Sequence, residues 1–194
     1  MTQTTRTEHD SMGPVEVPTE ALWGAQTQRS LQNFAISDDR IPVELIHALA
    51  QIKQAAAIVN ARLGVLDDNR RDLIVAVSAD IAEGRHDDQF PLRVWQTGSG
   101  TQTNMNVNEV ISNLISQSEG EPLGSHQPVH PNDHVNRSQS TNDAFPAAIH
   151  IAAAAGIQHR LLPEVQGLSE AFASKSKAWQ DIVKIGRTHL QDAV

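Results

Sequence analysis

Residues 97–115 read Thr97-Gly-Ser-Gly-Thr-Gln-Thr-Asn-Met-Asn-Val-Asn-Glu-Val-Ile-Ser-Asn-Leu-Ile115 and join a polar segment to an apolar stripe. The apolar residues recur at helical spacing and predict a buried helix that ends before Gly120. Ser99 and Thr101 stand where this helix begins, and there the unpaired N–H groups and the helix dipole favour an anion. A carboxylate fits such a site, and a hydroxyl-rich cap that touches only solvent is the alternative.

A second polar segment, residues 130–143, leads into another expected helix. It reads His130-Pro-Asn-Asp-His-Val-Asn-Arg-Ser-Gln-Ser-Thr-Asn-Asp143. Ser140, Thr141 and Asn142 stand at the N-terminus of that helix, and repeat the arrangement of the first segment. Two oxyanion sites in one chain suggest a ligand with two carboxylate groups.

Three histidines in this region invite a metal interpretation. His126, His130 and His134 are spaced by four residues, and Asp133 offers a fourth group of metal-ligand type. That spacing aligns side chains only on a continuous helix, which the intervening prolines do not allow. We therefore expect no metal site.

The third polar segment reads Gly186-Arg-Thr-His-Leu-Gln-Asp192. His189 lies among hydroxyl, amide and carboxylate groups, and an imidazole in such surroundings can exchange protons near neutral pH. For this segment taken alone, a polar turn with a surface histidine is the alternative. Three polar segments of this kind in one chain favour an active site.

The remaining pattern predicts a mainly α fold. Further helices are expected at residues 19–34 with Thr19 as N-cap, at 42–63, and at 67–83 with Asp67 as N-cap. Two more helical stretches are expected from 142 to Gly186, with a kink or a brief break between them at Pro163. Aromatic residues make up only 4% of the chain, and alanine supplies much of the 39% that is hydrophobic, which suits helix–helix packing. Long alanine-rich helix replaces mixed helix and loop near residue 140, so we expect domains at 1–139 and 140–194.

Charge and composition exclude several classes of protein. The chain has 15 basic and 23 acidic residues and a net charge of −8, which argues against nucleic-acid and membrane-surface partners. It contains no cysteine, so disulfides, thiolate zinc sites and cysteine nucleophiles are excluded. The N-terminus has no apolar signal segment, and the longest nearly apolar run is too short to span a bilayer. We expect a soluble, cytoplasmic protein.

Together the three segments resemble the class II fumarase branch of the fumarase/aspartase superfamily. The matching stretches are Gly98-Ser-Gly-Thr-Gln-Thr-Asn-Met-Asn106, His130-Pro-Asn-Asp133 with Gln139-Ser-Thr-Asn-Asp143, and Lys184-Ile-Gly-Arg-Thr-His-Leu-Gln-Asp-Ala193. The resemblance implies a small N-terminal helical lyase domain, residues 1–139, followed by the start of a long-helix bundle, residues 140–194. It also implies a homotetramer whose active sites each use three chains, and a reaction without metal or organic cofactor.

The activity that the resemblance implies is the reversible hydration of fumarate to L-malate. The reaction passes through a dianionic aci-carboxylate, which needs preorganised hydrogen-bond donors. The implied substrate-binding residues are Ser99, Thr101, Ser140, Thr141, Asn142 and Thr188. His189 would handle the water that leaves or attacks. His130, Asn132 and Asp133 match a second dicarboxylate site of the family.

The sequence also departs from the family pattern. Gln127 and Pro128 stand where some members carry a basic residue, and Thr141 replaces the more usual serine. The family's third signature, Gly-Ser-Ser-x-Met-Pro-x-Lys-x-Asn, carries a serine base and a substrate-binding lysine and does not occur in the 194 residues. We therefore expect the N-terminal part of a longer enzyme, inactive by itself.

Two other functions stay open at this point. Aspartases typically carry glutamine where His189 stands, and water needs a titratable partner more than ammonia does, so the histidine favours a hydratase. An aspartate ammonia-lyase of the same superfamily is the first alternative. A non-catalytic helical assembly module is the second.

Overall fold

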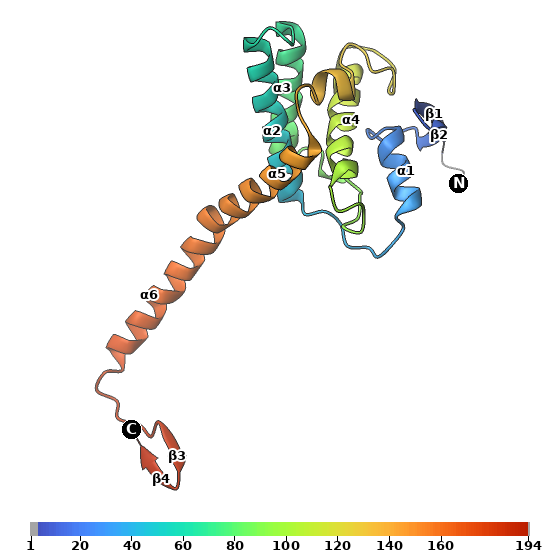
Figure 1. Ribbon diagram of the computed structural model, residues 1–194. Helices are drawn as coiled ribbons and strands as arrows, with labels where there is room; N and C mark the ends of the chain where they lie inside the picture. The colour runs from blue at the N-terminus through green and yellow to red at the C-terminus, as the bar shows by residue number, and fades with distance from the viewer. Residues whose placement is uncertain (1–3, 194) are drawn as a thin grey trace. The chain divides into compact units, whose positions relative to one another are not determined.

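The computed structural model describes residues 4–193, and the described chain begins with a β-hairpin (Figure 1). Strand β1 (Thr5–Asp10) pairs antiparallel with strand β2 (Gly13–Pro18). The Arg6 guanidinium group donates to the Glu8 carboxylate and to main-chain carbonyl oxygens of residues 18, 19, 21 and 23. This network fixes the segment after the hairpin in a non-helical path.

Helix α1 (Ala25–Asn33) begins six residues after Thr19, so the N-cap predicted at Thr19 is wrong. The physical reason is that tertiary contacts replace a local cap. The Glu109 carboxylate accepts main-chain N–H groups of the first turn, including those of Gly24 and Thr27. A side chain more than eighty residues away therefore decides where this helix starts.

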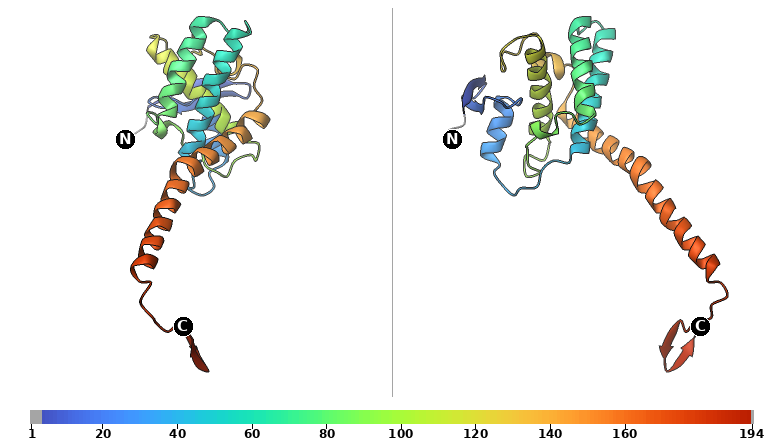
Figure 2. Two further views of the ribbon diagram at one scale, coloured as in Figure 1. Left: turned by 90° about the vertical axis from the view of Figure 1, so that its left-hand side faces the viewer. Right: turned by 180° about the vertical axis from the view of Figure 1, so that it is seen from behind.

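Helices α2 (Val43–Arg62) and α3 (Asp68–Ala82) lie side by side, as Figures 1 and 2 show, and both confirm the prediction. Their ends follow from local residues. The backbone at Gly64 has φ of 72°, a left-handed conformation that glycine adopts after a helix. Asp67 Oδ1 accepts the Arg70 N–H at 2.9 Å and caps α3.

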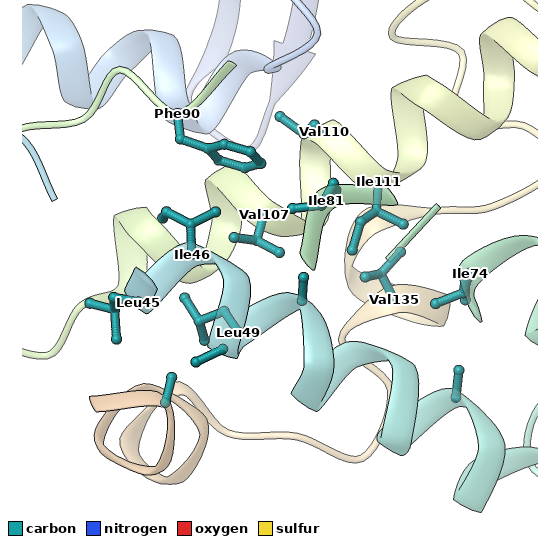
Figure 3. Close-up of a cluster of buried hydrophobic side chains, with 14 of the residues drawn as sticks. Leu45, Ile46, Leu49, Ile74, Ile81, Phe90, Val107, Val110, Ile111 and Val135 are labelled. Carbon is teal, nitrogen blue, oxygen red and sulfur yellow. The ribbon is translucent and has the colours of Figure 1, made fainter. Parts of the chain in front are cut away.

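Helix α4 (Thr101–Ser118) forms the centre of the first part of the structure, and it is buried along most of its length. It packs against α1, α2 and α3. The predicted stripe is confirmed, since Val107, Val110, Ile111 and Ile115 are fully buried and Leu114 packs partly buried against the same core. Figure 3 shows the core in which Val107, Val110 and Ile111 lie with residues of α2 and α3, with Phe90 and with Val135.

The later elements include short turns and a second β-hairpin that the sequence did not predict. After the 3₁₀ turn η1 (Asp87–Gln89) the chain contains a π-type turn η2 (Pro131–Val135), α5 (Thr141–Gly156), a π-type turn η3 (Ile157–Leu161), α6 (Leu162–Ala178), β3 (Arg187–His189) and β4 (Gln191–Ala193). Helix α6 ends eight residues before Gly186, so the prediction of helix up to that glycine is wrong. After Gly186, strands β3 and β4 pair as a short antiparallel hairpin.

The described chain forms two compact units, one up to Ala152 and one from Ala153. The division falls inside α5, whereas the domain boundary predicted between residues 139 and 140 stays a prediction. The prediction of a mainly α fold is confirmed. None of the helices in residues 4–193 combines the length and the apolar content that crossing a membrane requires.

Replacing Ile111 by alanine tests the central place of α4. Ile111 is fully buried, so the variant leaves a cavity, and we expect the free energy of unfolding to fall by about 2–5 kcal/mol. The control is Val59→Ala, because Val59 is 50% exposed and should change the value by less than about 0.5 kcal/mol. Urea unfolding measures both, and equal effects would contradict a core built around α4.

Candidate active site

Hydroxyl groups gather at the N-terminus of α4, as the sequence predicts. Ser99 Oγ lies 3.0 Å from Thr101 Oγ1 and 3.3 Å from Thr97 Oγ1, and all three side chains are exposed. Gly100, between Ser99 and Thr101, is the N-cap and has a left-handed backbone with φ of 70°. The turn therefore presents the hydroxyl groups of Ser99 and Thr101 at the positive end of the helix dipole.

Gly100 also brings this turn against helix α5. A Cβ atom at Gly100 would lie 2.4 Å from Cγ of Phe145, which is far inside van der Waals contact. Only glycine therefore fits there, both for its φ angle and for the space beside the ring. This close approach places the first turn of α4 beside the first turns of α5.

The second polar segment forms the N-terminus of α5. Thr141 begins that helix, and its Oγ1 accepts a hydrogen bond from Asn104 Nδ2 of α4 at 3.0 Å. Ser140 Oγ accepts the N–H of Asn142 at 3.3 Å. The structure thus brings together the two helix N-termini that the sequence marked separately, with Ser140 and Asn142 exposed and Thr141 half-buried.

Behind this junction lies a buried lysine that sequence reasoning missed. Lys53 of α2 is fully buried, and its Nζ donates to Asn104 Oδ1 at 2.7 Å. It also donates to Asn136 Oδ1 and Gln139 Oε1, both at 3.0 Å. Burial lowers the pKa of Lys53 to about 7, because its partners are neutral amides and the charged form loses hydration.

The π-type turn η2 organises the histidines of the second segment. His130 Nδ1 accepts the main-chain N–H groups of Asn132 and Asp133, both at 3.2 Å. His134 Nδ1 accepts the N–H of His130 at 2.8 Å, and burial lowers the pKa of His134. These histidine nitrogens act as acceptors for the backbone, and residues 4–193 contain no group of three His, Cys, Asp or Glu side chains able to hold a metal ion.

A cavity of about 220 Å³ lies beside this turn. Its lining includes His130 and Asn132, two residues predicted for the second dicarboxylate site. Asp133, predicted with them, lines a neighbouring and larger hollow of about 590 Å³ with Arg70 and Arg137. The three residues of the predicted set therefore lie together at η2, with Asp133 directed to the second hollow and its Oδ2 3.6 Å from His130 Nδ1.

Glu109 lines the same 220 Å³ cavity and fastens α1 to α4. Its carboxylate accepts the Thr27 hydroxyl at 2.6 Å and the N–H groups of Gly24, Gln26 and Thr27 at 2.8–3.1 Å. Burial raises the pKa of Glu109 to about 7, although these four donors act in the opposite direction. The sequence offered no signal for this role, since a glutamate within a helix is usually a surface residue.

The third polar segment lies in the second compact unit. Thr188 and His189 belong to β3, which pairs with β4 so that His189 faces Gln191 across the hairpin. Both side chains are exposed within that unit. Leu190 makes the turn with φ of 61°.

Comparison with known proteins identifies the family of the chain. A family model described as lyase matches residues 13–194. The chain belongs to the lyase family. The lyase chain is 76% identical to a class II fumarate hydratase of Prochlorococcus marinus (strain MIT 9313) over 97% of its own length, and 66% identical to one of Parasynechococcus marenigrum (strain WH8102) over all of it.

A solved structure shows the same fold. The crystal structure of a class II fumarase from Schistosoma mansoni superposes on the lyase chain with a TM-score of 0.93 at 44% identity, over 98% of this chain and 40% of that one. The lyase chain spans 41% and 42% of the lengths of the two sequence relatives. The resemblance to class II fumarases is confirmed.

Two glycines of the first segment offer a matched test of the junction between α4 and α5. Gly100→Ala would strain a left-handed backbone and push into Phe145, so we expect a loss of more than about 2 kcal/mol in the free energy of unfolding. Gly98→Ala meets nothing within 4 Å and should cost less than about 0.5 kcal/mol. Urea unfolding of both variants checks this, and similar losses would show that Gly100 does not hold the junction.

The pH dependence of stability tests the environment of Lys53. Its pKa is about 7 in the folded chain and 10.5 as the ordinary value, so between these pH values the unfolded chain binds more protons. The free energy of unfolding should therefore rise with pH relative to Lys53→Met, by up to about 1.4 kcal/mol per pH unit. Urea unfolding at pH 7, 8 and 9 measures the difference, and parallel curves for the two proteins would contradict it.

Proposed function

We propose that this lyase catalyses the reversible hydration of fumarate to L-malate as part of a longer enzyme. The observation that carries the proposal is the contact between two hydroxyl-bearing helix N-termini, those of α4 and α5. Two such termini offer donors for the oxygens of a dianion without a neutralising lysine or arginine at the surface. Relatives at 57–76% identity are named class II fumarate hydratase, which supports this reaction and favours neither alternative.

The substrate-binding role follows from the chemistry of these side chains. The residues proposed to bind the dicarboxylate are Ser99, Thr101, Ser140, Thr141, Asn142 and Thr188. During dehydration a base takes a proton from the carbon of L-malate next to one carboxylate, and that carboxylate then carries the extra negative charge. The resemblance assigns this base to the serine of the third family signature, which does not occur in the 194 residues. Preorganised hydroxyl and amide donors stabilise this dianionic form more than the substrate itself, which lowers the barrier.

His189 is the proposed proton-exchange residue. When hydroxide leaves L-malate it must gain a proton to depart as water, and the reverse step must remove a proton from the attacking water. An imidazole titrates near neutral pH and can serve in both directions. The exposed position of His189 on β3 leaves its ring accessible to such a water.

We propose that His130, Asn132 and Asp133 hold a second dicarboxylate molecule. The 220 Å³ cavity beside η2 supports this role for His130 and Asn132, which line it. The Asp133 side chain is itself a carboxylate and would act on the ligand only through His130, whose Nδ1 lies 3.6 Å from Asp133 Oδ2.

A homotetramer is the proposed assembly. The residues Leu161, Val165, Leu168 and Phe172 recur along η3 and α6, Trp179 follows at the C-cap, and each of the five is more than half exposed. No described residue of α6 is buried within its own chain. An apolar stripe of this length is stable in water only when another helix covers it, and bundled subunits supply such helices.

The reaction is tested with the complete protein as its gene encodes it. Purified protein should convert fumarate to L-malate and release no ammonia from L-aspartate. His189→Asn should lower kcat by about 10²–10⁴-fold, because the proton-exchange group is lost. The matched control is His86→Asn, which lies in the turn before η1 and should keep wild-type turnover. Ammonia release, or full turnover of His189→Asn, would contradict the proposal.

A further inference from the structure

Lys53 uses its whole hydrogen-bonding capacity on three segments of the chain. Its acceptors are Asn104 of α4, Asn136 after η2, and Gln139 just before α5. An ammonium group has three N–H donors, and each acceptor takes one. A neutral amine would direct its lone pair at one of these oxygens, so the arrangement fits the protonated form. We call Lys53 and these three amides the amide cage.

Lys53 is an unusual residue for this position, because it brings a charge into the interior. The side chain is fully buried and no carboxylate is among its partners, so its charge is desolvated without neutralisation. Methionine has a similar volume and carries no charge, but it would leave Asn104 Oδ1 and Gln139 Oε1 without the donor that they have now. A charge retained in the interior without neutralisation indicates a functional role, and the position of the cage shows which one.

The amide cage is joined directly to the N-terminus of α5. Asn104 accepts from Lys53 through Oδ1 and donates through Nδ2 to Thr141 Oγ1 at 3.0 Å. The Thr141 oxygen is thereby an acceptor, and its own O–H proton is directed elsewhere. Gln139, the next acceptor of Lys53, is the residue before Ser140.

Hydrogen bonds in such a series strengthen one another. A positive charge at the amide oxygen of Asn104 withdraws electron density and makes its N–H group a stronger donor. The same polarisation passes to the Thr141 hydroxyl, whose O–H group then becomes a better donor to an anion.

We propose that Lys53 is a positioning residue of the dicarboxylate site. Acting through Asn104, it holds Thr141 against α4 and strengthens the Thr141 hydroxyl as a donor to a substrate carboxylate. This inference rests on the proposed function, because it takes the ligand at the two helix N-termini to be a dicarboxylate.

A double-mutant cycle tests the inference, with succinate as the probe and the complete protein at pH 6.5. The measured quantity is the dissociation constant of succinate. Where two binding events are seen, the one that Thr141→Val weakens is taken as the site at the two helix N-termini. Lys53→Met and Thr141→Val should each weaken it about tenfold, the value of about one hydrogen bond. The double variant should bind within twofold of Thr141→Val alone, because both changes remove the same interaction.

Asn104→Asp provides a second route if Lys53→Met does not fold. It keeps an oxygen acceptor for the ammonium group but removes the N–H donor to Thr141, so it should weaken succinate binding at least tenfold. Ile74→Ala is the control for stability, since Ile74 is fully buried in α3 and makes no part of the cage. It should lower the free energy of unfolding and leave succinate binding unchanged.

The possible outcomes distinguish the proposed function from the role inferred for Lys53. Wild-type protein that binds no succinate would overturn the proposed function together with the inference. Wild-type binding that Lys53→Met and Asn104→Asp leave unchanged would overturn the inference alone. Fully additive effects of Lys53→Met and Thr141→Val, about a hundredfold together, would also overturn it, because Lys53 would then act independently of Thr141.

Discussion

Helix α4 is buried on almost every side and yet carries polar side chains, and this constraint shapes the rest of the first unit. A buried amide, hydroxyl or carboxylate is costly unless it finds a partner. Ser112 and Ser116 donate to the carbonyl oxygens of Val129 and Gln127. Asn113 binds Leu22 O and the Gly124 N–H. The loops around α4 are therefore held in place by its polar residues.

The same constraint builds the site. Glu109 accepts hydrogen bonds from the first turn of α1, and Asn104 forms hydrogen bonds with Lys53, Asn136 and Thr141. The second polar segment thus reaches α4 through interior hydrogen bonds, while its exposed hydroxyl and amide groups remain at the surface. A chain with a net charge of −8 can in this way offer a local anion site, since helix N-termini and neutral donors provide the attraction.

Sequence reasoning succeeded where the deciding interaction is local. Asp67 caps α3 through a residue three positions away, and Gly64 ends α2 through its own backbone conformation. The hydroxyl residues at the starts of α4 and α5 were also recognisable, because helix N-termini have a local signature. The roles predicted for them remain predictions, whereas the family and the mainly α fold are confirmed.

Sequence reasoning failed where residues distant in the sequence determine the start of a helix or the burial of a side chain. The start of α1 depends on Glu109, and nothing near Thr19 reveals that contact. The apolar Val59 of α2 is half exposed, whereas the polar Lys53 and Asn60 of the same helix are buried. A lysine in a helix ordinarily indicates a surface position. Lys53 can be buried because three side-chain amides, which are distant in the sequence, accept its hydrogen bonds in the folded chain.

The most direct measurement is a crystal structure of the complete protein with bound succinate. The account predicts carboxylate oxygens within about 2.5–3.0 Å of the Thr101 and Thr141 hydroxyl oxygens, with the hydrogen bond from Asn104 to Thr141 intact. Succinate bound elsewhere, with both hydroxyl groups facing only water, would contradict the claim that the paired N-termini of α4 and α5 form the dicarboxylate site.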